Sequence, residues 1–139
     1  MKPFRRYDDF AVGDIFPDAP LAFQITPGAV DAFLKATGGI KPVDKCEGGD
    51  RKAPSMLASV YLVGLLKARK SPPGGIHAKQ SIRFFRSLLV NETVVLQAKV
   101  VEKYLRNERP YMVASFEARG DAGDLIATGR ITTIWGKDL

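Results

Sequence analysis

The sequence predicts an α+β fold in which an antiparallel sheet wraps around one long central helix. Residues 56–66 are apolar on nearly every face, a pattern typical of a buried helix. From residue 77 onward, apolar residues alternate with polar ones over long segments, which is the period of β-strands. Turn residues separate these segments, so consecutive strands are expected to pair as hairpins. Such a sheet, following a single buried helix, packs that helix on one of its faces.

A first, amphipathic helix is expected over residues 27–37. Thr26 provides an N-cap, and Pro27 fits the first helical position. Gly38 and Gly39 then supply a stop. Between these signals, apolar residues and one threonine recur at helical spacing: Val30, Phe33, Leu34 and Thr37.

The central helix is expected to run from residue 54 to residue 70, with Ser55 as its cap. The sequence Ser-Pro-Pro-Gly-Gly at residues 71–75 ends it. Three basic residues gather at its C-terminal end, where positive charge complements the helix dipole: Lys67, Arg69 and Lys70. A binding role for these cations is the alternative interpretation.

Four strands are expected in the second half of the chain, over residues 77–84, 94–100, 111–118 and 125–135. Turn chemistry separates the last three of them, at residues 106–110 and 120–124.

The chain has 139 residues and is expected to form one domain over residues 1–139. Hydrophobic residues make up 45% and charged residues 26%, which excludes a disordered or low-complexity chain. Cys46 and His77 are the only residues of their kinds, so an internal disulfide and a His/Cys metal cluster are excluded. The spacing of the carboxylates supports no metal site either. We therefore expect neither a metal nor a cofactor.

A net charge of +6 favours an anionic partner, such as an acidic carrier protein or a phosphate-bearing substrate. Binding of nucleic acid would need aromatic residues interleaved with the basic ones on an exposed face. Phe84 and Phe85 offer little of this, so no nucleic-acid partner is expected. The basic residues of the strands and turns that suit an anionic partner are Arg83, Arg86, Lys99, Lys103, Arg106 and Arg109.

No membrane segment or targeting signal is expected. The first nine residues begin basic and turn acidic before any apolar run, unlike a signal peptide. The longest apolar stretch, residues 56–66, is too short to span a bilayer. These features predict a cytoplasmic location.

Several segments, in order along the chain, carry a family resemblance: residues 10–16, 25–38, 73–88, 91–94 and 127–130. The third contains Pro-Gly-Gly-Ile-His-Ala-Lys-Gln-Ser-Ile-Arg-Phe, and the fourth reads Asn-Glu-Thr-Val. In this order they resemble the MaoC-like dehydratases and (R)-specific enoyl-CoA hydratases, which have a Gly-Asp-Thr/Arg turn where Asn91 to Thr93 stand. The resemblance covers nearly the whole chain and implies the hot-dog fold.

The resemblance implies binding of acyl thioesters carried by coenzyme A or acyl carrier protein. The usual reaction of the family is reversible hydration of a trans-2-enoyl thioester to a 3-hydroxyacyl thioester. Its signature, Gly-Asp-x-Asn-Pro-x-His, supplies a carboxylate and an imidazole that hold a water between them. A helix N-terminus, usually within Ala-His-Gly-Met, donates backbone N–H groups to the thioester carbonyl.

The chain departs from this signature at the catalytic positions. Residues 38–44 stand in its place and read Gly-Gly-Ile-Lys-Pro-Val-Asp. Gly39 replaces the aspartate, Lys41 replaces the asparagine, and Asp44 replaces the histidine. The pair of groups that activates water is therefore missing, and these residues cannot run the usual mechanism.

The second motif reads Ala-Pro-Ser-Met at residues 53–56, without the histidine and glycine of the family. The resemblance nevertheless implies that Pro54, Ser55 and Met56 bind substrate. The backbone N–H groups of Ser55 and Met56 can form an anion or carbonyl site without any particular side chain.

Three residues are candidates for a relocated catalytic group: Asp44, Glu47 and His77. Hot-dog thioesterases activate water with a carboxylate near the central helix, so Asp44, Glu47 or Asp31 of the first helix suits that role. The plainer interpretation makes them solvated carboxylates, with His77 a structural or surface residue at the start of a strand.

These observations favour a non-catalytic MaoC-like subunit of a 3-hydroxyacyl dehydratase or enoyl hydratase, which shapes the acyl pocket in a heterodimer with a catalytic MaoC-like chain. Two alternatives remain open. In one, the chain is an independently active, homodimeric dehydratase or thioesterase that uses Asp44, Glu47 or His77. In the other, it is a non-enzymatic acyl-binding module.

Overall fold

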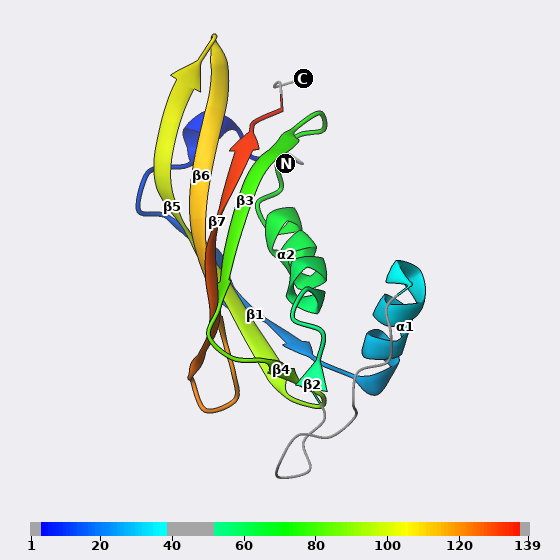
Figure 1. The fold of residues 1–139 in the computed structure, drawn as a ribbon. Helices are drawn as coiled ribbons and strands as arrows, with labels where there is room; N and C mark the ends of the chain where they lie inside the picture. Colours follow the sequence, from blue (N-terminus) through cyan, green and yellow to red (C-terminus); the bar gives the residue numbers. More distant parts are fainter. Residues whose placement is uncertain (1–3, 39–51, 137–139) are drawn as a thin grey trace.

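A five-stranded antiparallel sheet curves around one helix, which confirms the predicted α+β fold (Figure 1). The computed structural model describes residues 4–38 and 52–136. The strand order in the sheet is β1-β5-β6-β7-β3. The strands are β1 (Ile15–Gln24), β3 (Ile76–Phe84), β5 (Thr93–Arg106), β6 (Arg109–Arg119) and β7 (Leu125–Ile134).

The inner face of the sheet carries the core, as the alternating sequence predicts. Val94, Leu96, Ala98 and Val100 of β5 are buried, and so are Met112, Ala114, Phe116 and Ala118 of β6. Both strands are longer than predicted, and they extend to the turn that joins them. Asn107 and Glu108 join them, both with positive φ, in the two-residue turn that matches the twist of a hairpin.

The strand β1 is absent from the sequence prediction. It contains Pro17 and Pro20, and its register with β5 shifts between Phe16 and Leu21. Proline lacks the N–H that a central strand needs, so these residues conceal the strand pattern. Their presence fits the position of β1 at the edge of the sheet.

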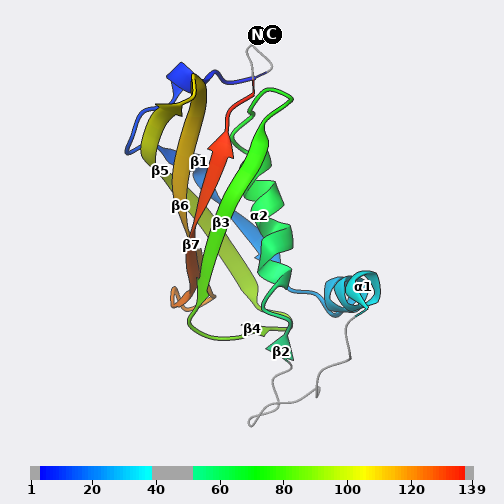
Figure 2. The same ribbon diagram turned by 45° about the horizontal axis from the view of Figure 1, so that its top comes forward.

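The first helix, α1 (Pro27–Thr37), has the predicted bounds. The Thr26 hydroxyl oxygen accepts a hydrogen bond from the Ala29 N–H at 3.1 Å, and Gly38 ends the helix in the left-handed conformation with a φ of 68°. Local capping signals therefore predicted the bounds of this helix correctly. The helix follows β1 and lies beside the body of the sheet and the central helix (Figure 2).

The central helix, α2 (Leu57–Lys67), is shorter than predicted at both ends. The Leu57 N–H donates to the Pro54 carbonyl at 3.0 Å, and the Ala58 N–H donates to the Ser55 carbonyl at 3.1 Å. These three-residue spacings form a tight turn ahead of the helix. Met56 is the N-cap and makes no side-chain cap, so the expectation that Ser55 caps the helix is wrong.

The sheet covers only one side of α2. Leu57, Leu62 and Leu65 are buried against it, whereas Met56 and Val63 remain 55% and 49% exposed. A Cβ atom at Gly64 would lie 3.0 Å from the Phe23 ring, so glycine lets the helix approach β1 closely. The prediction of a helix buried on every face is therefore wrong in this respect, since apolar side chains remain uncovered on the side away from the sheet.

Within the described ranges, neither helix is long enough to cross a membrane.

Candidate functional site

The entry into α2 is attached to a small second sheet. The strand β2 (Lys52–Ala53) pairs with β4 (Leu88–Leu89), with Lys52 opposite Leu89 and Ala53 opposite Leu88. The tight turn at residues 54–56 follows β2 directly, at the end of the molecule where β2 and β4 lie (Figure 1). The position of β4 therefore sets the position of the helix N-terminus.

A network around Arg86 holds β4 in place. Arg86 Nη1 and Nη2 donate to Glu92 Oε1 and Oε2 at 2.9 and 2.8 Å. Arg86 Nε donates to Asp124 Oδ2 at 2.6 Å. These hydrogen bonds, first to Glu92 and then to Asp124, raise the pKa of Arg86, and the bond to Arg86 lowers the pKa of Asp124. Glu92 Oε1 also accepts the Leu89 N–H of β4 at 2.7 Å.

Residues 91–93 form a turn at the position where the resemblance implies a Gly-Asp-Thr/Arg turn. Asn91 has a φ of 73°, a left-handed conformation that glycine adopts most readily and asparagine tolerates. The family has glycine at this position. The turn places Glu92 beneath Arg86, where its side chain is 8% exposed.

The N-terminal turn of α2 presents free backbone donors. The carbonyls of Pro54 and Ser55 accept bonds from the helix, but the N–H groups of Ser55 and Met56 have no acceptor among the described residues. Such groups carry the positive end of the helix dipole. Ser55 is half-buried and Met56 is exposed, so a ligand carbonyl oxygen can approach these donors.

His77 lies at the other end of α2. It follows the 71–75 turn, as predicted, and stands opposite Thr133 of β7. With Arg69 and Thr133 it lines a hollow beside the C-terminal end of the helix. Since α2 has 11 residues, its length of about 16 Å separates His77 from the 54–56 turn of the same chain.

The other candidate residues either lie outside the described residues or are exposed. Asp44, Glu47, Gly39 and Lys41 lie outside the described residues. Asp31 lies on an exposed face of α1. Among the described residues, no three His, Cys, Asp or Glu side chains cluster where they could hold a metal ion.

The strand β3 was predicted over residues 77–84, but its position at the edge of the sheet was not. It ends the strand order of the sheet, and its residues 76–81 are all exposed. Ile76 at its start is 49% exposed, as is Val63 on α2. The order of strands in a sheet depends on long-range pairing, so no local signal could mark this strand as an edge.

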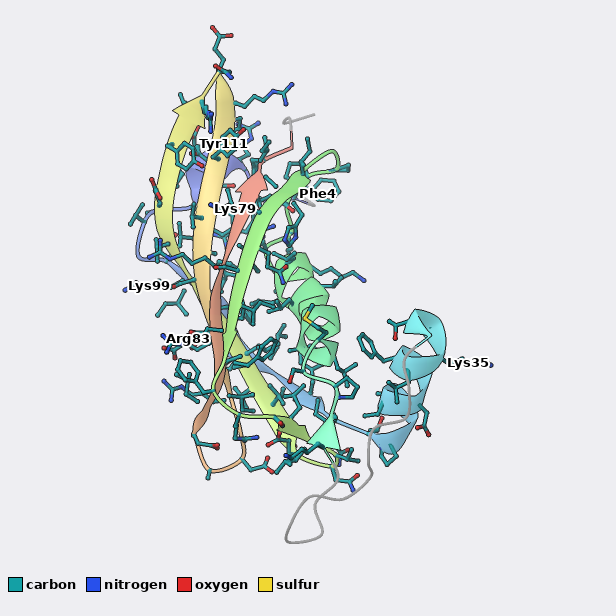
Figure 3. The ribbon with its side chains drawn as sticks, viewed as in Figure 1. Phe4, Lys35, Lys79, Arg83, Lys99 and Tyr111 are labelled. Atoms are coloured by element: carbon teal, nitrogen blue, oxygen red, sulfur yellow. The ribbon has the colours of Figure 1, made fainter. Side chains whose placement is uncertain are left out.

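The basic residues have two different roles. Arg86 belongs to the network at β4, and Lys103 Nζ donates to the carbonyls of Tyr7 and Phe10 at 3.0 and 2.7 Å, so both serve the fold. Lys79, Arg83 and Lys99 instead project from the face of the sheet turned away from α2 (Figure 3).

No family model and no curated protein sequence matches the chain. The chain is similar in structure to R-hydratase PhaJ1 from Pseudomonas aeruginosa, with a TM-score of 0.81 and 19% identity over 95% of this chain and 86% of that chain. It is also similar to the HadBC 3R-hydroxyacyl-ACP dehydratase complex from Mycobacterium tuberculosis, with a TM-score of 0.72 and 16% identity over 90% of this chain and 96% of that chain.

A third similar structure is a hot-dog-like protein from Thermanaerovibrio acidaminovorans, with a TM-score of 0.65 and 14% identity over 91% of this chain and 84% of that chain. At these identities the likeness shows the fold. The predicted hot-dog fold is therefore confirmed.

Proposed function

We propose that residues 1–139 form one acyl-thioester-binding unit of the MaoC-like dehydratase family, and that this unit is the non-catalytic subunit of a 3-hydroxyacyl dehydratase or enoyl hydratase. Two of the similar structures are named as an R-hydratase and a 3R-hydroxyacyl-ACP dehydratase, and their likeness extends over at least 90% of this chain. The second of them is described as the HadBC complex. The proposed site of action is the cytoplasm.

The N-terminal turn of α2 is the proposed substrate-binding element. A thioester carbonyl oxygen would accept the free N–H groups of Ser55 and Met56, which lie at the positive end of the helix dipole. The exposed side chains of Met56 and Val63 offer apolar surface to the acyl chain. The cations of the outer sheet face suit coenzyme A or an acidic acyl carrier protein.

The replaced dyad is the observation that carries the non-catalytic role. Hydration needs an acid and a base on either side of one water, and Gly39 and Asp44 stand where the aspartate and histidine are required. His77, the only imidazole of the chain, lies at the opposite end of α2 from the proposed carbonyl donors. A partner chain would therefore have to supply the reacting groups.

The exposed edge strand β3 is the proposed pairing surface. A nine-residue edge with six consecutive exposed residues presents unpaired backbone groups that another sheet can extend. A partner that joins there would also approach the apolar side chains of Val63 and Ile76. The proposed partner is a MaoC-like chain that retains the intact signature, and a second copy of this chain is the alternative.

Native mass spectrometry tests the proposal. The chain is mixed with a long-chain enoyl-CoA, alone and with a MaoC-like chain that retains the signature. The proposal expects the chain alone to hold the enoyl-CoA unchanged, and expects a heterodimer in the mixture. Gain of one water by the thioester in the presence of the chain alone would show independent activity, and Asp44→Ala, Glu47→Ala and His77→Ala would then locate it. Retention of the ligand without any heterodimer would favour the acyl-binding module.

A further inference from the structure

Arg69 is a buried cation that lacks a carboxylate partner among the described residues. Its side chain follows the last turn of α2 and is 3% exposed. Nη1 donates one hydrogen bond, to Thr133 Oγ1 at 3.0 Å, and Cζ lies 5.2 Å from the centre of the Trp135 ring. Burial lowers the pKa of Arg69 to about 10, so the guanidinium stays protonated at neutral pH.

The contacts of Arg69 go beyond the predicted role as a helix-dipole cation. Its hydrogen bond reaches β7 and not a carbonyl of α2. The carbonyls at the helix end already have backbone donors: Gly64 accepts from Ala68, Leu66 from Arg69, and Lys67 from Lys70. Buried charges in proteins are normally paired, because an unpaired one loses its hydration without compensation.

Two buried donors at this place have no partner among residues 4–38 and 52–136. They are Arg69 Nε and Trp135 Nε1, and both atoms are buried. The Arg69 guanidinium and the Trp135 ring contact one another, so the two donors lie in the same small region. Orphaned buried donors are rare in folded proteins and point to an acceptor that the described residues do not supply.

The region is open on two sides through hollows, and no described residue that lines them is acidic. One hollow, of about 430 Å³, is lined by Lys67, Arg69 and Lys70 among others. The other, of about 310 Å³, is lined by Arg69, Ser71 and His77 among others. The titratable groups that face Arg69 from α2 and β3 are therefore cationic or neutral, and the hydroxyls of Ser71 and Thr133 add polar groups.

We propose that Arg69 and the two hollows beside it form a binding site for a phosphate-type oxyanion. A phosphate offers several acceptor oxygens and up to two negative charges, which suit one arginine flanked by Lys67 and Lys70. The site lies at the C-terminal end of α2, whereas the proposed thioester donors lie at the N-terminal end. It does not depend on the proposed function.

The chain has its own reporter for this site. Trp135 is its only tryptophan, and its ring contacts the Arg69 guanidinium. Titration with inorganic phosphate at constant ionic strength, with chloride as the balancing anion, is expected to change the Trp135 fluorescence in a saturable way. Arg69→Met is expected to weaken this response at least tenfold. Arg119→Met removes an exposed arginine from the end of β6 opposite to Pro110, whose carbonyl accepts the Trp135 backbone N–H. This variant serves as the matched control and is expected to leave the response unchanged.

The source of the phosphate group is distinguished by two further ligands. Adenosine 3′,5′-bisphosphate and adenosine 5′-monophosphate carry phosphate monoesters but no acyl thioester. Binding of the bisphosphate at least tenfold tighter than inorganic phosphate would assign the site to a phosphate monoester of a nucleotide carrier. Equal or weaker binding of both nucleotides would assign it to free phosphate.

The proposal would be overturned if wild-type protein showed no saturable response to any of these ligands. It would also be overturned if Arg69→Met bound phosphate as tightly as the wild type. Should Arg69→Met fail to fold, the double variant Lys67→Gln, Lys70→Gln provides the same test, since both lysines line the first hollow. Binding of acyl-CoA is measured separately, so failure of this site leaves the proposed thioester site untouched.

Discussion

Arg86 and Glu92 are joined by two parallel hydrogen bonds, from Nη1 to Oε1 at 2.9 Å and from Nη2 to Oε2 at 2.8 Å. The pair links the end of β3 to the start of β5. Through the Leu89 N–H it also fixes β4, which pairs with β2 just before the N-terminal turn of α2. A charge pair remote from the helix thus positions the backbone donors of the proposed thioester site.

Glu92→Gln is expected to lower the free energy of unfolding by about 1–3 kcal/mol. Glutamine fills the same volume but leaves Arg86 without its buried carboxylate, and it places an NH₂ donor where one of the two acceptor oxygens of Glu92 faces the guanidinium. Urea denaturation measures the change. Glu117→Gln is the matched control, because the Glu117–Arg119 ion pair, with an N···O distance of 3.0 Å, is exposed. Its free energy of unfolding is expected to change by no more than about 0.5 kcal/mol. Equal losses in the two variants would contradict the structural role of Glu92.

The stability of the chain is expected to depend on Asp124 at acid pH. The hydrogen bond from Arg86 lowers the pKa of the Asp124 carboxyl below its ordinary value of 3.8. A lowered pKa means that the folded state binds fewer protons than the unfolded state, so the contribution is present above pH 3.8 and is lost as the pH falls through the folded pKa. Melting temperatures of the wild type and Asp124→Asn are therefore expected to differ at pH 7 and to converge below pH 3.8. A constant difference across this range would exclude Asp124 as the cause.

Met56→Pro is expected to weaken acyl-CoA binding about tenfold, the equivalent of about 1.4 kcal/mol. Met56 has a φ of −66°, which proline adopts, and its N–H has no acceptor among the described residues. The substitution removes one proposed donor and no donor that the tight turn or α2 uses, but proline also disfavours a helical conformation at Ser55 before it, so the fold of the variant has to be checked. Met56→Ala keeps the N–H and loses the side chain. Isothermal titration calorimetry compares the two variants, with circular dichroism to verify folding. Equal affinities would argue against a backbone contact to the thioester.

Ala78→Pro is expected to weaken self-association or heterodimer formation at least tenfold. A bulge falls between His77 and Lys79, so Ala78 has no register partner in β7. Proline is tolerated at a bulge of an edge strand, and on an edge it hinders pairing with a second sheet. Ala78→Ser keeps the backbone N–H and is the control. Sedimentation analysis measures the dissociation constant. An unchanged constant in a folded Ala78→Pro variant would show that the chain does not assemble through β3.

Local signals in the sequence were sufficient for the elements whose ends they determine. Thr26, Pro27 and Gly38 act on neighbouring backbone groups, so the bounds of α1 could be predicted to the residue. The alternation along β5 and β6 reports which face is buried, and the structure buries that face. The order of these pieces along the chain also led to the hot-dog fold.

Features that depend on contacts between distant segments were not predictable. Two prolines conceal β1, and its pairing with β5 decides that it is a strand. The exposed edge of β3 follows from the strand order. The contacts of Arg69 with Thr133 and Trp135 could not be predicted, because these residues are more than sixty residues away along the chain.

The candidate site also has one feature that the sequence predicts and one that depends on the fold. The loss of the dyad at Gly39 and Asp44 is visible in the sequence, because a motif is a local pattern. That His77 stands at the far end of α2 from Ser55 and Met56 is a property of the fold. The sequence alone therefore could not show whether His77, as a candidate catalytic residue, lies near the helix N-terminus.

The central claim is that this chain binds an enoyl thioester but needs a partner for hydration. The most direct measurement follows the ultraviolet absorbance of crotonyl-CoA and longer enoyl-CoAs, first with the chain alone and then with a MaoC-like chain that retains Gly-Asp-x-Asn-Pro-x-His. We predict no loss of absorbance with the chain alone, and a gain in rate or a shift in chain-length preference in the mixture. Hydration by the chain alone would contradict the proposed non-catalytic role and would make Asp44, Glu47 and His77 the residues to replace first.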